Sequence, residues 1–362
     1  MLDRLPVELL SLVLHLATPL DCTPSFYQER RATLRSCSLV SKEMRQLAQP
    51  MLPEVFAAEV DEDVKVLNVR LGNTRRGSGV KLLVLLGEQD LLSRNSYDDL
   101  LGICPMIVEL RFVRVDGIDL SWLRLSARLA HLIISAGTLR HNKPGPIPSL
   151  SKLSICATQP YDDGILEHLL LPEITPKLRA FGMSSVVDPF TFDSLPLPKF
   201  PSALTERLAV LSVDILDSHV EEAVSSVRPG ALLVDCAISN LRYMREPLYP
   251  ALRLYSFTDE PVIEAALDVE ADHLSDFTAR LRLDQARYLE LLILPAALRA
   301  APTVTSSFGR ALESLVRLCE SVGVEVVWEE EGDWQYQSLI SPFFWRRAES
   351  GMRQNVGEEG QQ

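Results

Sequence analysis

A few polar residues in the middle of the chain are of the types that hydrolytic catalysis uses. Asp217 and His219, together with Ser212 or Ser218, could supply the acid, the base and the nucleophile of a triad. A triad is recognised by its geometry, however, and closeness in sequence is no evidence of that geometry. We therefore expect these residues to have no catalytic role.

A second polar group, Asp163, Glu167 and His168, could supply carboxylate and imidazole ligands to a metal ion. Asp163 is better explained as the negative charge at the start of a helix, and His168 as part of one face of that helix. The six cysteines have no C-x-x-C spacing and are expected to be reduced, and the sequence has no glycine-rich phosphate loop, G-x-S-x-G or H-E-x-x-H motif. We expect a protein that is not an enzyme, with no cofactor, no metal and no catalytic residue.

Composition and charge limit the kinds of partner. The chain has 362 residues, of which 47% are hydrophobic, and a formal net charge of −13. Between residues 255 and 285 there are eight acidic and two basic side chains. Such a surface repels phosphate backbones, so we expect no nucleic acid as a partner; it is either a solvated face or a site for a basic partner. No apolar run nears the ~20 residues that cross a bilayer, so we expect no membrane partner and a cytoplasmic or nuclear, soluble protein.

The elements that organise the chain begin with an apolar helix. Apolar residues at helical spacing define one wide face of that helix: Leu5, Leu9, Leu10, Val13, Leu14 and Leu16. Pro6 suits the first helical position, and the prolines from Pro19 to Pro24 predict a loop. Ser41 can cap a further helix that Pro50 stops. The segment therefore predicts three short helices.

Two phrases of this segment stand out: Leu5-Pro6-Val7-Glu8-Leu9-Leu10 and the stretch from Leu34 to Ala48, which contains Leu39-Val40-Ser41-Lys42. Together they resemble an F-box, particularly the fungal versions with a lengthened loop. The resemblance implies docking on the Skp-type adaptor of a cullin-RING ubiquitin ligase, while the rest of the chain selects substrates. Carried over by position, the adaptor-binding residues would be Leu5, Pro6, Leu9, Leu10, Val13, Leu39 and Val40. Met44 stands where the family often has Trp. The alternative is that these apolar positions form only the inside of a helical cap.

Beyond this segment, short apolar triples of the form φ-x-x-φ-x-φ recur, mostly at the ~20 to 29 residue spacing of leucine-rich repeats. They are Val80-Leu83-Leu85, Ile107-Leu110-Phe112, Leu129-Leu132-Ile134, Leu150-Leu153-Ile155, Leu178-Phe181-Met183, Leu208-Leu211-Val213, Ala231-Val234-Cys236, Leu252-Tyr255-Phe257 and Leu289-Leu292-Leu294, with Ser321-Val324-Val326 as a poor tenth. Helical patterns at 162–170, 217–224 and 306–318 alternate with them.

This alternation predicts the fold class and the domain organisation. We expect an α/β protein in which a three-helix F-box-like hairpin, 1–56, and a linker, 57–79, precede an irregular leucine-rich-repeat-like solenoid, 80–345, with a curved, mainly parallel sheet. Residues 346–362 are expected to form a disordered tail. The alternative is an unrelated α/β domain such as a doubly wound sheet, because that class also alternates strands with helices.

In such a solenoid, residues between the members of each triple face the inner side of the sheet, where a protein substrate would bind. The candidates are Glu109, Arg111, His131, Lys152, Ser154, Ser212, Asp235 and Ser256, with the apolar Ile133, Val210, Leu233 and Leu254 among them. Several are apolar, so another part of the chain could cover them instead. The aromatic cluster Phe343, Phe344 and Trp345 is one candidate cover, and capping of the last repeat is its expected use.

A short basic phrase, Arg75-Arg76-Gly77-Ser78, also resembles a basophilic kinase site, although such phrases recur in ordinary solvated loops.

Taken together, the sequence predicts a non-catalytic substrate receptor of a cullin-RING ligase, which promotes ubiquitin transfer through effective concentration. The alternative is a leucine-rich-repeat interaction scaffold outside any ubiquitin ligase.

Overall fold

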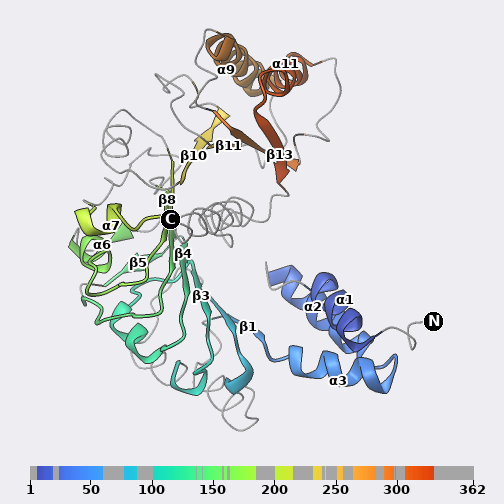
Figure 1. Cartoon of the computed structure of the whole chain (residues 1–362), viewed down its shortest axis with the longest axis vertical. Coiled ribbons are helices and arrows are strands. Elements are labelled where there is room, and N and C mark those ends of the chain that lie inside the picture. The colour runs from blue at the N-terminus through green and yellow to red at the C-terminus, as the bar shows by residue number, and fades with distance from the viewer. Residues whose placement is uncertain are drawn as a thin grey trace, which may run out of the picture. The chain divides into compact units, whose positions relative to one another are not determined.

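A computed structural model describes residues 6–18, 24–59, 77–87, 101–135, 137–140, 142–156, 159–160, 164–184, 200–214, 231–238, 241, 251–255, 264–282, 289–296, 298 and 306–329. The chain forms two compact units (Figure 1). The first unit contains Met1–Leu178 with Gly332–Ser338, and the second contains Arg179–Glu331 with Leu339–Gln362. In the part of the chain so described, every helix is too short or too polar to cross a bilayer.

Three helices open the first unit: α1 (Val7–Ala17), α2 (Pro24–Cys37) and α3 (Lys42–Met51). The expected cap of α3 is present, because the Ser41 hydroxyl accepts a hydrogen bond from the Met44 backbone N–H. Pro50 lies in the last turn of α3, which ends one residue later. The helices enclose a small core made of Leu10, Leu14, Leu34, Met44, Ala48 and Met51. None is long enough to be stable alone, so this shared core holds them.

The sheet of the first unit contains β1 (Val55–Glu59), β2 (Leu82–Leu86), β3 (Glu109–Val113), β4 (His131–Ser135) and β6 (Lys152–Cys156). These strands pair in parallel and in chain order, with the leucines of successive triples in register: Leu83, Leu110, Leu132 and Leu153. Three shorter elements lie between these strands, η2 (Gly77–Gly79), η3 (Leu120–Leu125) and β5 (Thr138–Leu139), and two follow β6, namely β7 (Gln159–Pro160) and α6 (Gly164–Leu169). Helix α6 confirms the helical pattern predicted at 162–170.

The second unit repeats the same parallel arrangement. Its strands are β8 (Ala180–Ser184), β9 (Val210–Asp214), β10 (Ala231–Ala237), β11 (Ala251–Tyr255), β12 (Leu291–Pro295) and β13 (Glu325–Glu329). Its helices are α7 (Ser202–Thr205), α9 (Glu264–Arg282) and α11 (Ser307–Ser321). Helices α9 and α11 lie side by side, and the Ser306 hydroxyl caps α11 by accepting from the Gly309 backbone N–H (Figure 1). The cap confirms the helix predicted at 306–318.

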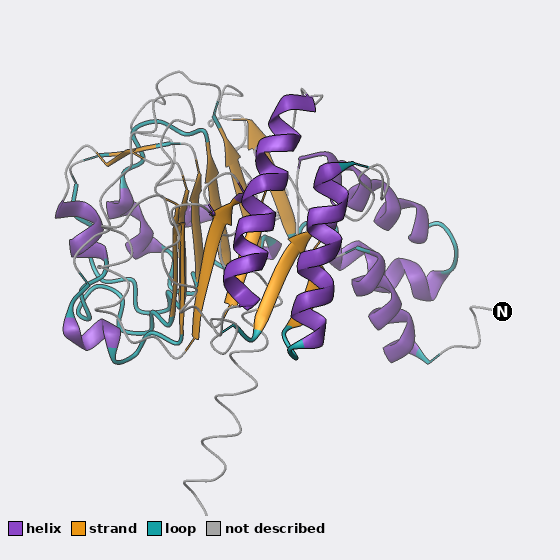
Figure 2. Ribbon diagram, turned by 90° about the horizontal axis from the view of Figure 1, so that it is seen from above, coloured by secondary structure: helices purple, strands orange, loops and turns teal. Residues whose placement is uncertain are grey.

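In the first unit the strands follow the order β1-β2-β3-β4-β6, and in the second they follow the order β8-β9-β10-β11-β12-β13, which in both units is also their order along the chain. The strands appear in orange in Figure 2. The chain is therefore a mixed α/β protein with a large parallel sheet. A doubly wound sheet reverses its strand order at a switch point. The described strands show no such reversal, so the doubly wound alternative is wrong for them.

Two details of the predicted organisation differ from the structure. Strand β1 begins at Val55 and pairs with β2, so it crosses the predicted boundary at residue 56 into the predicted linker. In β11, Leu254 pairs with Cys236, a member of the preceding triple, and so lies on the face that carries the triples, whereas the sequence had predicted Leu254 on the inner side of the sheet. A shift by one residue turns every side chain of a strand to the other face, and Ala251 and Arg253 face inward instead.

The acid-rich stretch around residues 255–285 was predicted only as a charged surface. Most of it forms helix α9, which buries Ala271, Leu274, Phe277 and Leu281 at helical spacing. Asp272 and Asp276 remain exposed on its other side. The helix predicted at 217–224, the aromatic cluster at 343–345 and the tail at 346–362 lie outside the described residues.

Candidate protein-docking surface

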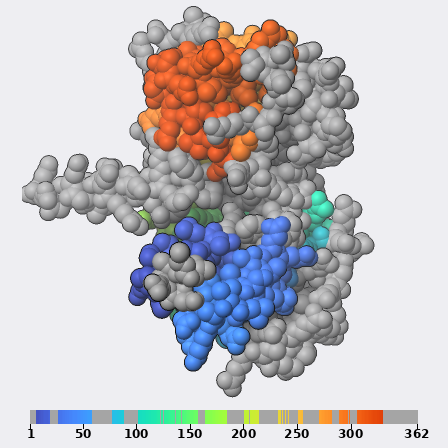
Figure 3. All heavy atoms as spheres, turned by 90° about the vertical axis from the view of Figure 1, so that its right-hand side faces the viewer, coloured from blue at the N-terminus to red at the C-terminus, as the bar shows by residue number. Residues whose placement is uncertain are grey.

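Exposed apolar side chains gather on the three N-terminal helices. Seven of the nine large apolar side chains that are exposed among the described residues belong to α1 or to the turn between α2 and α3. We call these seven the apolar surface: Val7, Leu9, Leu12, Val13, Leu16, Leu39 and Val40. Figure 3 shows these helices, in blue, at the surface of the molecule. Exposed apolar groups that cluster in this way are typical of protein-interaction sites.

Helix α1 is apolar on two sides. Leu10 and Leu14 face the core of the three helices. Leu9, Leu12, Val13 and Leu16 have the spacing i, i+3, i+4 and i+7, so they form one continuous stripe, and all four are exposed. A helix that only covers its own domain needs a single apolar side, so the second stripe calls for a partner.

The turn that carries the other two residues of the apolar surface is held by its own hydrogen bonds. The backbone N–H groups of Leu39 and Val40 donate to the carbonyls of Ser36 and Cys37, at 3.0 and 3.1 Å. Arg45 Nε donates to the Ser38 carbonyl at 3.1 Å. Leu39 and Val40 are therefore presented at 78% and 59% exposure on an ordered turn. Pre-ordering of this kind lowers the entropy cost of binding.

The structure separates the predicted adaptor-binding residues into two groups. Pro6, Leu9, Val13, Leu39 and Val40 are exposed. Leu10 is only 4% exposed and packs in the helix core, so its prediction as a docking residue is wrong. Leu5 lies outside the described residues.

The sequence analysis placed Leu16 on the apolar face of this helix but selected neither Leu12 nor Leu16 as an adaptor-binding residue. Their spacing from Leu9, at i+3 and i+7, does indicate that they share its side of the helix. The prediction of one wide apolar face for α1 did not separate the side that packs in the core from the side that stays exposed. Leu16 is 73% exposed, more than any other described side chain of α1 in the apolar surface.

A buried arginine attaches these helices to the sheet of the first unit. Arg30 of α2 is 3% exposed and donates hydrogen bonds to the Thr18 carbonyl (3.3 Å), the Met51 carbonyl (3.0 Å) and Glu54 Oε2 (3.2 Å). Lys81, directly before β2, binds the other carboxylate oxygen of Glu54 at 2.6 Å. We call Arg30, Glu54 and Lys81 the Glu54 joint. It connects α1, α2, α3 and β2.

Apolar packing strengthens this attachment. Tyr27 of α2 packs against the cluster formed by Val55, Leu82, Val84 and Val113 on one face of the sheet. The helices thus cover the first strands, and the apolar surface is held in a defined orientation within the first unit.

The predicted substrate-binding residues include an ionic cluster on β3 and β4. Arg111 pairs with Glu109 Oε1 at 2.6 Å, and His131 Nδ1 lies 3.3 Å from Glu109 Oε2. Burial by itself raises the pKa of Glu109, but the hydrogen bond from His131 and the charge of Arg111 outweigh it and lower that pKa to about 2. Lys152 pairs in register with His131 on the next strand. The structure therefore brings Glu109, Arg111, His131 and Lys152 together.

The inner side of the sheet is less open than predicted. Arg111 (5% exposed), Ser154 and Ser212 are buried, so a partner cannot reach them in this conformation, and that part of the prediction is wrong. In the second unit the same side is an apolar cluster of Ala180, Val210, Leu233, Ala251, Leu291 and Ile293. Asp235 lies in β10, in register with Asp214 and Arg253, but its side chain is not among those that the structure describes. Ser256 lies outside the described residues. Of the predicted substrate-binding residues whose side chains are described, Glu109, His131 and Lys152 are partly exposed.

The residues considered for catalysis or metal binding do not form a site in the described part of the chain. Asp163, Asp217, Ser218 and His219 lie outside it. His168 Nε2 is 3.1 Å from the Pro144 carbonyl, to which it can donate. Within the described ranges, no three His, Cys, Asp or Glu side chains are placed to hold a metal ion.

The described cysteines are not joined in disulfide bonds, and most of them are buried. Burial raises the pKa of the Cys104 thiol to about 11. Burial, with the nearby charge of Glu320, raises the pKa of Cys319 to about 12. Neither thiol is a thiolate nucleophile at neutral pH.

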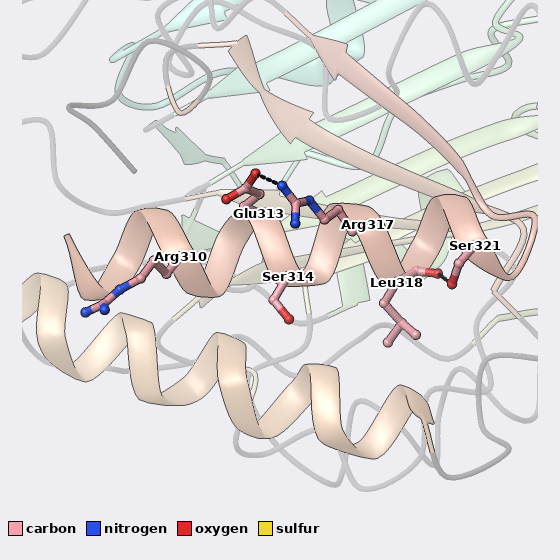
Figure 4. Close-up of a pocket in the computed structure, with 6 residues that line it drawn as sticks. All are labelled: Arg310, Glu313, Ser314, Arg317, Leu318 and Ser321. Carbon is pink, nitrogen blue, oxygen red and sulfur yellow. Dashed lines mark hydrogen bonds and ion pairs between the residues drawn. The ribbon is translucent and has the colours of Figure 1, made fainter. Parts of the chain in front are cut away.

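A hollow of about 440 Å³ lies along helix α11 (Figure 4). The described residues that line it all come from this one helix: Arg310, Glu313, Ser314, Arg317, Leu318 and Ser321. Arg317 is bound by Glu313. Ligand sites depend on polar groups that converge from several elements. The hollow is therefore a weaker candidate than the apolar surface.

Comparison with known proteins does not assign the chain to a family. No family model matches the chain, and no curated protein matches it significantly.

Proposed function

We propose that the chain is the non-catalytic substrate-recognition subunit of an SCF-type cullin-RING ubiquitin ligase. One observation carries the proposal: the phrases that resemble an F-box coincide with the apolar surface. Leu9, Val13, Leu39 and Val40 are four of the adaptor-binding residues that the resemblance implies, and each is exposed on α1 or on the turn before α3. The Skp-type adaptor is the partner that this surface would bind, and cullin would be reached through the adaptor.

The remainder of the chain would hold the substrate. Its strands run parallel and in chain order, which is the arrangement of a leucine-rich-repeat-like solenoid and supports that part of the proposal. Because much of the inner side is buried, the substrate contacts are best sought at the partly exposed Glu109, His131 and Lys152. The receptor would raise the effective concentration of its target near the ubiquitin-charged enzyme, with no bond-making residue of its own.

The test measures binding of the purified full chain to a Skp-type adaptor. The variant Leu9→Asp plus Val13→Asp puts two charges on the exposed stripe of α1 without touching Leu10 or Leu14. Leu9 and Val13 are each 46% exposed, so docking would bury about half of each, and each substitution forfeits about half of the ~1.5–3 kcal/mol that full burial gives. We expect binding to weaken about 100-fold, from a loss of roughly 3 kcal/mol.

The matched control is Val108→Asp plus Val322→Asp, which changes the two exposed valines outside the apolar surface. This control should bind like the parent, and circular dichroism should show the same helix content for all three proteins. If the Leu9 and Val13 double variant binds the adaptor as tightly as the parent does, the proposed docking surface is wrong.

The rival function is a repeat scaffold that never enters a ligase. It predicts that the parent chain does not bind the adaptor at all. Deleting residues 1–53 is a poor way to separate the two functions, because Tyr27 and Arg30 contact the sheet and their loss would expose Val55 and Leu82 in either case. The double variant leaves that packing in place and is therefore the better discriminator.

A further inference from the structure

Basic side chains flank the turn that presents Leu39 and Val40. Between residues 35 and 45 the sequence has three basic side chains and one acidic side chain, although the whole chain has a formal net charge of −13. We call the three exposed basic residues, Arg35, Lys42 and Arg45, the basic rim. They lie in the last turn of α2 and the first turn of α3. This end of the apolar surface is therefore bordered by cations.

The described part of the chain does not neutralise the basic rim. No described acidic side chain forms an ion pair with any of its three members. Arg45 Nε donates to the Ser38 carbonyl at 3.1 Å, which holds the guanidinium beside the turn. The carboxylate of Glu43 accepts hydrogen bonds from its own backbone N–H and from the Ser41 hydroxyl, and these bonds lower its pKa more than the charge of Lys42 does. The cations of the rim thus remain available to a partner.

The position of these cations indicates which class of partner fits the surface. Helices that lie on a lipid surface carry Lys and Arg along the sides of their apolar stripe. Helix α1 holds most of the apolar surface, yet it has no Lys or Arg in its eleven residues. The cations gather at the turn between α2 and α3 instead, where carboxylates at defined places on a folded protein can meet them.

On the basis of the proposed function, we infer that the surface of the Skp-type adaptor that covers Leu39 and Val40 is acidic, and that its carboxylates pair with the basic rim. Complementary charges accelerate the encounter of two proteins and fix their relative orientation. Burial of apolar side chains acts mainly on the dissociation rate. The basic rim and the apolar surface therefore have separate kinetic effects on the same complex.

The experiment measures association and dissociation of the purified full chain and a labelled Skp-type adaptor by stopped-flow fluorescence. The variant Arg35→Glu plus Lys42→Glu reverses two charges of the rim and keeps Arg45, which holds the turn. At about 0.05 M salt we expect association to slow about tenfold, which is within the range of electrostatic steering. At about 1 M salt the Debye length falls to about 3 Å, so the difference should shrink to about twofold or less. Dissociation should change less than association does.

Two further variants complete the design. Arg35→Gln plus Lys42→Gln removes the two charges without reversing them and should give an intermediate association rate. The matched control, Lys143→Glu plus Lys177→Glu, makes the same change of net charge as the reversed variant, at two exposed lysines in the segments that precede β6 and β8. The control should associate like the parent, and circular dichroism should show the same helix content for all four proteins.

Three results would overturn the acidic docking surface. The reversed variant could associate with the adaptor as fast as the parent does at low salt, or the control could slow equally; either result leaves the proposed function standing. A parent chain that does not bind the adaptor at all would remove the proposed function as well. The third result concerns vesicles of phosphatidylserine and phosphatidylcholine: if the parent binds them and the reversed variant does not, the basic rim serves a lipid surface.

Discussion

Replacing Arg30 by methionine tests whether the Glu54 joint stabilises the first unit. Methionine keeps an unbranched apolar stem of similar length, so the change removes the charge and the donors while retaining much of the packing. Three acceptors lose a hydrogen bond: the carbonyls of Thr18 and Met51 and the carboxylate of Glu54.

The size of the effect follows from burial. Arg30 and Glu54 have side-chain exposures of 2% and 12%, and breaking a buried ion pair by removing one partner costs about 3–5 kcal/mol. Glu54 keeps its contact with Lys81, which places the expected loss at the low end, about 3 kcal/mol. Lys81→Met is the matched control. Its side chain is half exposed, so it should cost at most about 1 kcal/mol.

Urea unfolding followed by circular dichroism measures the free energy of unfolding for the parent and both variants. Chains with two compact units often depart from two-state unfolding, so hydrogen exchange at the Lys81 and Leu82 amides should localise the change to the first unit. If Arg30→Met destabilises the protein no more than Lys81→Met does, Arg30 does not hold the helices to the sheet.

Two further perturbations test the electrostatics and the packing. The pKa of Glu109 is lowered to about 2, from an ordinary value of 4.5. The ionised form of Glu109 should therefore stabilise the fold by up to about 3 kcal/mol at neutral pH. That contribution should be lost as the pH falls from about 4.5 to about 2. The difference in unfolding free energy between the parent and Glu109→Gln should therefore shrink across that range. A difference that stays constant with pH would contradict the ionic cluster. Gly77→Ala should destabilise the protein by about 1–3 kcal/mol, because the new Cβ would lie 2.6 Å from the Ile103 carbonyl oxygen. Gly102→Ala is the matched control, because Gly102 is in a helical position and its new Cβ would have no atom within 4 Å. This variant should stabilise the protein by up to about 1 kcal/mol. Equal melting temperatures for these two alanine variants would argue against the packing of η2.

Features that depend on neighbours in the sequence were predicted correctly. Ser41 and Ser306 cap α3 and α11 because a cap requires only a hydroxyl and the backbone of the next turn. The triples centred on Leu110, Leu132 and Leu153 form parallel strands because their apolar spacing matches the pleat of a strand.

Other features were decided by residues far away along the chain. The apolar spacing of α1 shows which residues share a side of the helix, but not which side meets α2 and α3; hence Leu10 is buried while Leu9 remains exposed. Strand β1 was missed because it gains its hydrogen bonds only by pairing with β2, across a stretch that reads as polar loops. The register of β11 depends on pairing with β10, and a shift of one residue exchanges its two faces.

The amino-acid sequence by itself therefore determined the local elements, the parallel α/β class and the F-box-like phrases. The tertiary structure decided which apolar residues remain at the surface and which polar residues of the sheet are buried. The physical reason is that periodicity and capping act over one or two turns of chain, whereas burial depends on every segment that packs against a side chain.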